Sequence, residues 1–450
     1  MKNITTSYIY SIFLIILMTA SAMSCSKPDW MDEVTPGTAQ EGGSNHREPV
    51  NDKRKVLVLY IAGYNDIQNY LAQNITDLMK GWLPKKTQSS NVLLVYSHMS
   101  KSRYDLKTPT EPVLFRLYSD NDNNAVADTI MTYPSTTISA SGMQLKNVLT
   151  YVKDTFKVPN YGLIFSSHGT GFLPVGYYSD PYNYEFNETM MYRQGWKDSS
   201  HMTAVPYVER EYDPSKPQTK SIGQSVSEGL SYEIDLKEFA EALPMKMDYI
   251  LFDACLMGGI ETAYELADKC DRLGFSQAEI LADGFDCYTT LTTHLLKNSE
   301  EADPLGVCKD YIDIYNAKSG DWRSATISLV DCNHLEPLAE VCRELFEKYR
   351  SNIATLSHYN TQRFYTGNHP WFFDLESILT EAGADTQELM HLRQALDDCV
   401  LYKGHTPIFL GEFSINTFSG FSMYLPSKGT AQLNRYYKTL KWNQATELVK

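Results

Sequence analysis

Two side chains in this sequence have the types and settings that covalent hydrolysis of a peptide bond needs. Cys255 comes shortly after the apolar run of residues 249–252 and is followed by a glycine-rich turn. His168 lies 87 positions earlier, just after the apolar run of residues 163–165, and precedes Gly169. A cysteine thiolate is a stronger nucleophile than water, and a histidine can protonate a leaving amine. The pair therefore predicts hydrolysis through a covalent acyl-enzyme.

The elements that carry these two residues must bring them together. A short apolar run bounded by turn residues is typical of a buried parallel strand, and ligands bind at the carboxyl ends of neighbouring strands in such a sheet. Taken singly, a cysteine is more often a buried structural thiol, and a histidine more often a satisfied core residue. His98 also ends an apolar run, but methionine and serine follow it instead of glycine. The shared setting of Cys255 and His168 favours the catalytic interpretation.

A predicted helix after the cysteine bears on how its thiol ionises. Ile260, Ala263, Tyr264 and Ala267 keep a helical period, so the positive end of this helix is expected to point at the sulfur. A helix terminus stabilises an anion by about 0.3–1 kcal/mol. This assists ionisation without completing it, so a histidine is required.

The order of these motifs resembles that of the clostripain-like cysteine peptidases, which are relatives of caspases, legumains and gingipains. The resemblance extends from about Arg54 to the C-terminus. Beside the His-Gly and Asp-Ala-Cys motifs, it rests on shorter marks in the same order: residues 55–62, Asn65, Asp66, Asn74, Ile75, residues 274–278, Gly284, Tyr288, residues 373–375 and residues 420–426. It implies a cysteine endopeptidase with a dyad of Cys255 and His168 and requires no third catalytic residue.

The family resemblance also implies how the substrate is held. The backbone N–H groups of Gly169 and Cys255 would form the oxyanion hole, and some relatives need calcium. Asp253 lies two positions before Cys255, on the same face of the strand, where a carboxylate could pair with lysine or arginine of the substrate. The simpler interpretation is a strand-end aspartate bonded to backbone. Asp283 is a second candidate for the pocket, and Ser276 a candidate for holding the substrate backbone.

Alternating strand and helix patterns predict an α/β fold. The expected strands are residues 55–62, 91–97, 112–118, 161–167, 248–253, 277–282, 324–330 and 420–425. Helical periods occur at residues 67–79, 145–156, 335–345 and 378–396. This alternation favours an α/β/α sandwich with a mostly parallel central sheet, and the resemblance implies its caspase-like version. The catalytic core is expected at residues 54–300, with a helical C-terminal part, residues 301–450, packed on the sheet.

A long connection without periodicity separates the two motifs. It extends from Gly176 to Gly229, and connections of this length are uncommon unless they are functional or mobile. We expect it to lie over the catalytic face and to keep the enzyme latent as a zymogen until the enzyme cuts it. The basic residues available for such a cut are Arg193, Lys197, Arg210, Lys216 and Lys220.

The N-terminus has the pattern of an export signal. Lys2, an apolar run shorter than a membrane-spanning helix, and small residues before Cys25 predict a signal peptide over residues 1–25. Residues 21–25, which end in Cys25, resemble a bacterial lipoprotein box, in which the cysteine is lipidated. The alternative is ordinary cleavage and secretion. Residues 26–53 predict a flexible tether. The protein is therefore expected at the bacterial outer membrane or cell surface.

Composition restricts the remaining functions. With 40 basic and 55 acidic residues the net charge is -15, which disfavours binding to nucleic acid. Seven cysteines remain after Cys25; in an oxidising compartment at least one is a free thiol, and the others form up to three disulfides or stay buried thiols. Zinc-ligand spacing is absent from the sequence, so no metal or other cofactor is predicted. The alternative function is a catalytically inactive lipoprotein of the same fold that binds peptide or glycan.

Overall fold

The computed structural model describes residues 53–102, 106–186, 204–206, 216–220, 225–227, 230–297 and 301–450. The predicted signal peptide, Cys25 and nearly all of the tether lie outside these residues, so those assignments stay predictions. No helix among the described residues is long and apolar enough to cross a membrane.

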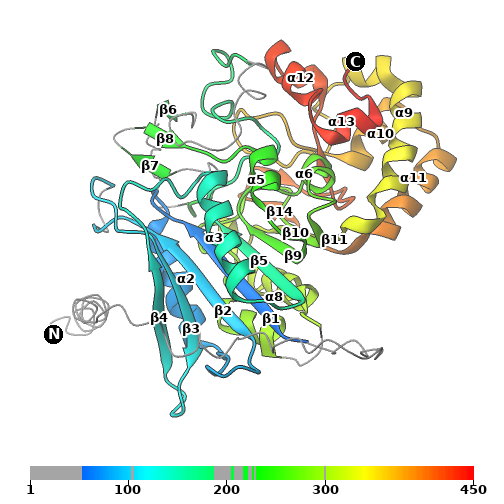
Figure 1. Cartoon of the computed structure of the whole chain (residues 1–450). Helices are drawn as coiled ribbons and strands as arrows, with labels where there is room; N and C mark the ends of the chain where they lie inside the picture. The colour runs from blue at the N-terminus through cyan, green and yellow to red at the C-terminus, as the bar shows by residue number, and fades with distance from the viewer. Residues whose placement is uncertain are drawn as a thin grey trace, which may run out of the picture. The chain divides into compact units, whose positions relative to one another are not determined.

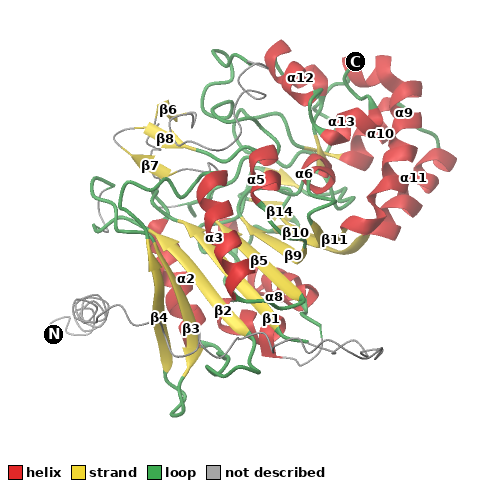
Figure 2. Cartoon of the chain, viewed as in Figure 1, coloured by secondary structure: helices red, strands yellow, loops and turns green. Residues whose placement is uncertain are grey.

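A nine-stranded sheet forms the centre of the described chain (Figure 2). Its five inner strands are parallel, in the order β10 (Cys270–Phe275), β9 (Met247–Asp253), β5 (Asn160–Ser166), β1 (Lys55–Ala62) and β2 (Val92–His98). Antiparallel strands extend both edges: β3 (Val113–Ser119) and β4 (Ala125–Thr132) beside β2, and β11 (Thr326–Asp331) and β13 (Val400–His405) beside β10.

Helices cover both faces of this sheet, because parallel neighbours require a crossover connection. In Figure 1, α3 (Gly142–Thr155) lies in front of the sheet, and α2 (Gln68–Lys80) and α8 (Pro304–Ala317) lie behind it. Every residue of β1, in the middle of the sheet, is buried, which explains its unbroken apolar sequence. The predicted α/β/α sandwich with a mostly parallel core is confirmed.

The C-terminal part continues from the sheet as mostly helical structure. It contains α9 (Leu335–Thr355), α10 (Leu375–Ala382), α11 (Thr386–Cys399), α12 (Ala431–Tyr437) and α13 (Lys441–Thr446). Because β13 belongs to the central sheet, this part is joined to the core by backbone hydrogen bonds. Gly383, with φ of 100°, ends α10 and divides the single helix expected over residues 378–396.

Shorter elements complete the fold. They are α5 (Leu236–Ala242), α6 (Ile260–Glu265), α7 (Tyr288–Thr292), β6 (Ala204–Pro206), β7 (Ser225–Ser227), β8 (Leu230–Tyr232), β12 (Phe373–Asp374), β14 (Ile408–Phe409), β15 (Phe413–Ser414) and β16 (Ser422–Met423). Strands β6, β8 and β7 form a small sheet within the long connection.

Two strand predictions were wrong. Residues 277–282 are not a strand of the central sheet; the neighbour of β9 is β10, which begins Cys-Asp-Arg and lacks an apolar run. The strand expected at residues 420–425 is reduced to β16, which pairs with β12 outside the central sheet. In both places, pairing between distant segments, and not local hydrophobicity, determines which residues join the central sheet.

One buried carboxyl makes the stability of this fold depend on pH. Glu238, in the first turn of α5, accepts a hydrogen bond of 2.5 Å from the backbone N–H of Gly142 at the start of α3. Burial raises the pKa of Glu238 from 4.5 to about 8. Since the folded state holds this proton and the unfolded state releases it, stability falls as the pH rises from about 4.5 to about 8.

We therefore predict that Glu238→Gln makes the protein less sensitive to alkaline pH. Glutamine keeps the oxygen that accepts from Gly142 but never ionises. The gain in melting temperature of the variant over the parent should be larger at pH 8.5 than at pH 5, a change that differential scanning calorimetry measures. Glu241→Gln, at an exposed position of the same helix, is the control. An equal difference at both pH values would contradict the prediction.

Candidate active site

The structure brings the two predicted motifs together at one edge of the sheet. β5 and β9 are parallel neighbours, with Ser166 opposite Asp253, so His168 and Cys255 follow adjacent strand ends. Gly169 has no room for a side chain: a Cβ atom there would lie 2.5 Å from the carbonyl oxygen of Cys255. Glycine at this position therefore lets the two turns meet.

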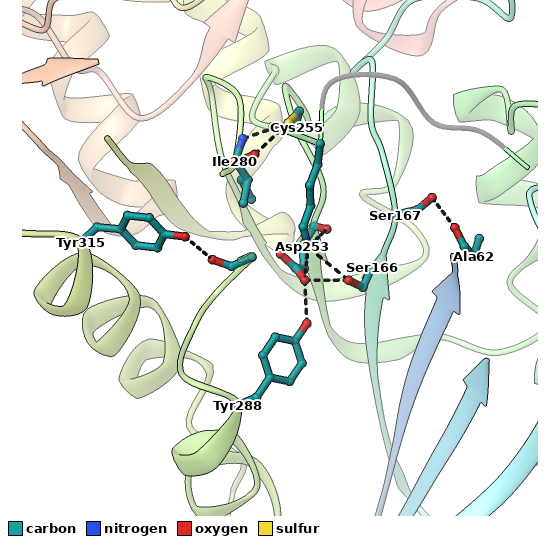
Figure 3. A network of polar contacts seen from close by, with 10 residues as sticks. Ala62, Ser166, Ser167, Asp253, Cys255, Ile280, Tyr288 and Tyr315 are labelled. Carbon is teal, nitrogen blue, oxygen red and sulfur yellow. Dashed lines mark hydrogen bonds and ion pairs between the residues drawn. The ribbon is translucent and has the colours of Figure 1, made fainter. Parts of the chain in front are cut away.

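Cys255 is fully buried and lies against a loop from beyond β10. Its Sγ accepts a hydrogen bond of 2.9 Å from the backbone N–H of Ile280 and lies 3.4 Å from the carbonyl oxygen of the same residue (Figure 3). The predicted helix after the cysteine is present as α6, which begins at Ile260 after a turn in which Leu256 has φ of 61°. Its effect on the ionisation of the thiol stays a prediction.

His168 is held by a carboxylate that was not assigned a role from the sequence. Its Nε2 lies 2.6 Å from Oδ1 of Asp66, which follows β1, and its side chain is 2% exposed. Its Nδ1 is buried and has no hydrogen-bond partner within the described parts of the chain. The contact with Asp66 fixes the orientation of the ring and leaves Nδ1 for a reacting group. The signal available in the sequence was the position of Asp66 just beyond a strand end.

Asp253 is completely buried at the centre of a cluster of polar side chains, called the Asp253 pocket below. Its Oδ2 accepts hydrogen bonds of 2.6 Å from the hydroxyls of Ser166 and Tyr288 (Figure 3). Gly284 closes the pocket with φ of 71°, and a Cβ atom at this residue would lie 2.7 Å from both carboxylate oxygens. The pocket thus presents a negative charge behind a position that only glycine fits.

Lys220, from the long connection, fills this pocket. Its Nζ lies 2.5 Å from Oδ2 of Asp253 and also contacts the backbone carbonyl of Asp253 and the hydroxyl of Ser166, at 3.3 and 3.4 Å. Both charged side chains are completely buried. Removing two charges from water is costly unless they are paired and hydrogen-bonded, as these are.

The backbone around Lys220 pairs with the loop after β10 as an added strand. The N–H of Lys220 donates to the carbonyl of Ile280 at 2.9 Å, and the N–H of Ala282 donates to the carbonyl of Gln218 at 2.8 Å. The carbonyl of Lys220 accepts a hydrogen bond of 3.0 Å from the N–H of Gly169. Strand addition of this kind is a common way for proteins to bind an extended peptide.

Two predicted substrate-binding residues have other contacts. The part-exposed carboxylate of Asp283 lies 3.5 Å from Nζ of Lys318, outside the group around Asp253. The hydroxyl of Ser276 is buried and bonds to Thr326 and to the carbonyl of Ala278, so it holds the protein's own loop instead of a substrate. These contacts involve no substrate, so the roles of Asp283 and Ser276 in substrate binding stay predictions.

His98, the other histidine at the end of an apolar strand, contacts a serine of the protein's own core. Nδ1 of His98 lies 2.7 Å from the hydroxyl of Ser139, and burial lowers the pKa of His98 to about 4. No group of three or more histidine, cysteine or acidic residues that could hold a metal ion occurs in the described ranges.

Comparison with known proteins identifies the class. The model of the clostripain family matches residues 209–448. The chain resembles the crystal structure of an inactive zymogen C11 protease from Parabacteroides distasonis, with 25% identity over 89% of this chain and 99% of that one and a TM-score of 0.68. It also resembles a secreted C11 cysteine protease from Bacteroides thetaiotaomicron in complex with an irreversible peptide inhibitor, with 21% identity over 88% and 99% and a TM-score of 0.66. No curated protein matches it.

The chain therefore belongs to the clostripain family, and its fold is that of a cysteine peptidase.

The closeness of Gly284 to the ion pair yields a prediction. In Gly284→Ala, the added methyl would lie 2.7 Å from Nζ of Lys220 as well as from Asp253, so the lysine should be expelled. Both proteins carry Cys255→Ala to prevent self-cleavage. Trypsin should then cut after Lys220 at least about tenfold faster in Gly284→Ala than in the parent, because lowering the free energy of local opening by about 1.4 kcal/mol suffices for that factor. Cleavage would be followed by mass spectrometry.

Gly320→Ala is the matched control, because Gly320 also has positive φ, 59°, but a Cβ atom there has no neighbour within 4 Å. If trypsin cut after Lys220 equally fast in the parent, Gly284→Ala and Gly320→Ala, the claim that only glycine fits at position 284 would be contradicted.

Proposed function

We propose that this protein is a cysteine endopeptidase that cleaves after lysine or arginine, with Cys255 as nucleophile and His168 as general acid and base. The observation that carries the proposal is the pose of Lys220. Its side chain lies in the Asp253 pocket, its backbone pairs with the loop at Ile280, and its carbonyl accepts from Gly169. This is the arrangement that a substrate residue preceding the cleaved bond would need.

The chemistry follows from these contacts. Sγ of Cys255 attacks the substrate carbonyl carbon, and the N–H of Gly169 donates to the oxyanion that develops. The backbone N–H of Cys255 is its second proposed donor; losing one such donor typically slows a reaction by about 10²–10³. His168, which has taken the thiol proton of Cys255, passes it to the leaving amine as the C–N bond breaks, and the acyl-enzyme forms. The same histidine then takes a proton from water, which hydrolyses the thioester, and returns it to Sγ.

Asp66 orients His168 in this scheme. Because its carboxylate binds Nε2, the ring cannot turn, and Nδ1 is the atom left to exchange the proton.

Selectivity for basic residues comes from Asp253. Apart from Lys220, the described groups that donate hydrogen bonds to the buried Asp253 carboxylate are the hydroxyls of Ser166 and Tyr288. The carboxylate therefore has capacity for one cationic group. Its Oδ1 has no hydrogen-bond partner among the residues described, so a guanidinium can bind both oxygens where the ammonium of Lys220 binds one. Acidic and large apolar side chains are excluded by the charge and by its burial.

The uncut chain is latent, because Lys220 occupies the pocket that a substrate must enter. We propose that the enzyme activates itself by cutting the bond between Lys220 and Ser221, which frees the carboxyl end of the segment to leave. Of the five basic residues considered in the connection, Arg193, Lys197 and Arg210 lie outside the described residues. Lys216 is exposed and lies four positions before the buried lysine.

We further propose that the protein is exported and anchored by lipid at Cys25. The tether of residues 26–53 would allow a root-mean-square reach of roughly 30 Å from the membrane. Its substrates would then be peptides or proteins at the cell envelope. Calcium dependence, an expectation from the family resemblance, is tested by assaying the enzyme with and without a chelator.

The dyad is tested by Cys255→Ala and His168→Ala, with substrates that carry lysine, arginine, aspartate or leucine before a fluorogenic leaving group. The parent should hydrolyse the lysine and arginine substrates only, and kcat/KM should fall by at least about 10³ in both variants, because each removes a reacting group. Cys342→Ala, at a buried thiol of α9, should keep full activity. A folded parent that hydrolyses none of these substrates, or a Cys255→Ala variant with parental activity, would favour the inactive binding protein instead.

Self-activation is tested by Lys220→Ala with Lys216→Ala as its matched control. The parent and the control should convert from one chain into two associated chains with a new terminus at Ser221, whereas Lys220→Ala should stay uncut. Intact-mass spectrometry and N-terminal sequencing would follow the conversion. A parent that is fully active while uncut would show that this cleavage is not the switch, although the dyad assignment would stand.

A further inference from the structure

Two cysteines far from the active site lie side by side. Cys270 begins β10, and Cys332 follows β11, in a 3-10 turn over Cys332–His334. The two strands are antiparallel neighbours, with Arg272 opposite Asp331, so both cysteines come at the same end of the pair. Their Sγ atoms are 3.6 Å apart, and they are 62 positions apart in the sequence.

We propose that Cys270 and Cys332 form a disulfide bond when the chain folds in an oxidising environment. Each thiol loses its hydrogen, and the two electrons pass to an oxidant of the disulfide class, such as oxidised glutathione or a protein disulfide donor. The oxidant leaves as two thiols after a mixed disulfide. The sulfur atoms must approach from 3.6 Å to about 2.0 Å, and both residues lie at the ends of elements, where small backbone shifts are easiest.

The bond is expected to form during folding and not afterwards. Cys270 is completely buried and Cys332 is 4% exposed, so an external oxidant has little access to either sulfur in the folded protein. Burial also raises the pKa of Cys270, with the neighbouring Cys332 adding to the effect, and this suppresses the reactive thiolate. The same burial protects the bond from reductants once it has formed.

The position of the bond gives it a consequence for the active site. The loop it closes contains the backbone at Ile280 and Ala282 that pairs with the Lys220 segment, and also Gly284 and Tyr288 of the Asp253 pocket. A cross-link over a loop of this length restricts the unfolded chain. The bond thus stabilises the part of the fold that forms the substrate-binding wall.

The test uses the full chain with Cys255→Ala, which removes the most reactive thiol. The protein is unfolded under reducing conditions and refolded with reduced and oxidised glutathione, free thiols are alkylated, and tryptic peptides are mapped without reduction. We expect the peptide Cys270–Arg272 linked to the peptide of residues 324–343. Protein refolded with reductant present, so that the bond cannot form, should melt about 2–5 °C lower.

Matched variants identify the partner, since the peptide of residues 324–343 contains Cys342 as well as Cys332. Cys332→Ala should abolish the link and the effect of reductant, whereas Cys342→Ala and Cys308→Ala should keep both. The same mapping on protein exported to a bacterial periplasm needs no refolding step. Both preparations are alkylated in denaturant, so that buried thiols react. Full alkylation of Cys270 and Cys332 in both, or a link of either to another cysteine, would overturn the proposal.

Discussion

The buried ion pair of Lys220 and Asp253 is the interaction on which the active site of the uncut chain depends. A carboxylate with no access to water is stable only when its charge is matched, and within the described residues Lys220 supplies the matching cation, with two hydroxyls donating to the same carboxylate oxygen. The pair holds one strand of the long connection against the loop that carries Ile280. In the function proposed above, the same pair would also keep a substrate side chain out.

The rest of the fold supplies the rigidity that this arrangement needs. β5 and β9 are neighbours in the parallel core, so the residues at their ends keep a fixed separation. Glycine at positions 169 and 284 allows backbone to approach within distances that a Cβ atom would prevent. Self-activation in this picture needs no rearrangement of the sheet. On this proposal, a single cut would free a segment whose lysine lies where a substrate's would.

The clostripain family and its α/β/α fold were predictable because their signals are local. Apolar strands that end in His-Gly and Asp-Ala-Cys, together with amphipathic helices between them, give the architecture and place the candidate residues Cys255 and His168 at strand ends. Asp253 was singled out as well, because residues two apart on a strand share a face. These inferences needed only periodicity and the order of motifs along the chain.

The sequence by itself thus determined the fold class and the family, and it placed the candidate residues Cys255, His168 and Asp253 at the ends of two strands. Only the tertiary structure decided that these strands are neighbours, that Lys220 contacts Asp253, that Asp66 contacts His168, and that Cys270 meets Cys332. The physical reason is that these contacts join segments from 33 to more than 100 positions apart. Neither hydrophobic period nor residue type encodes which distant segment a loop will meet; that is fixed by how the whole chain packs.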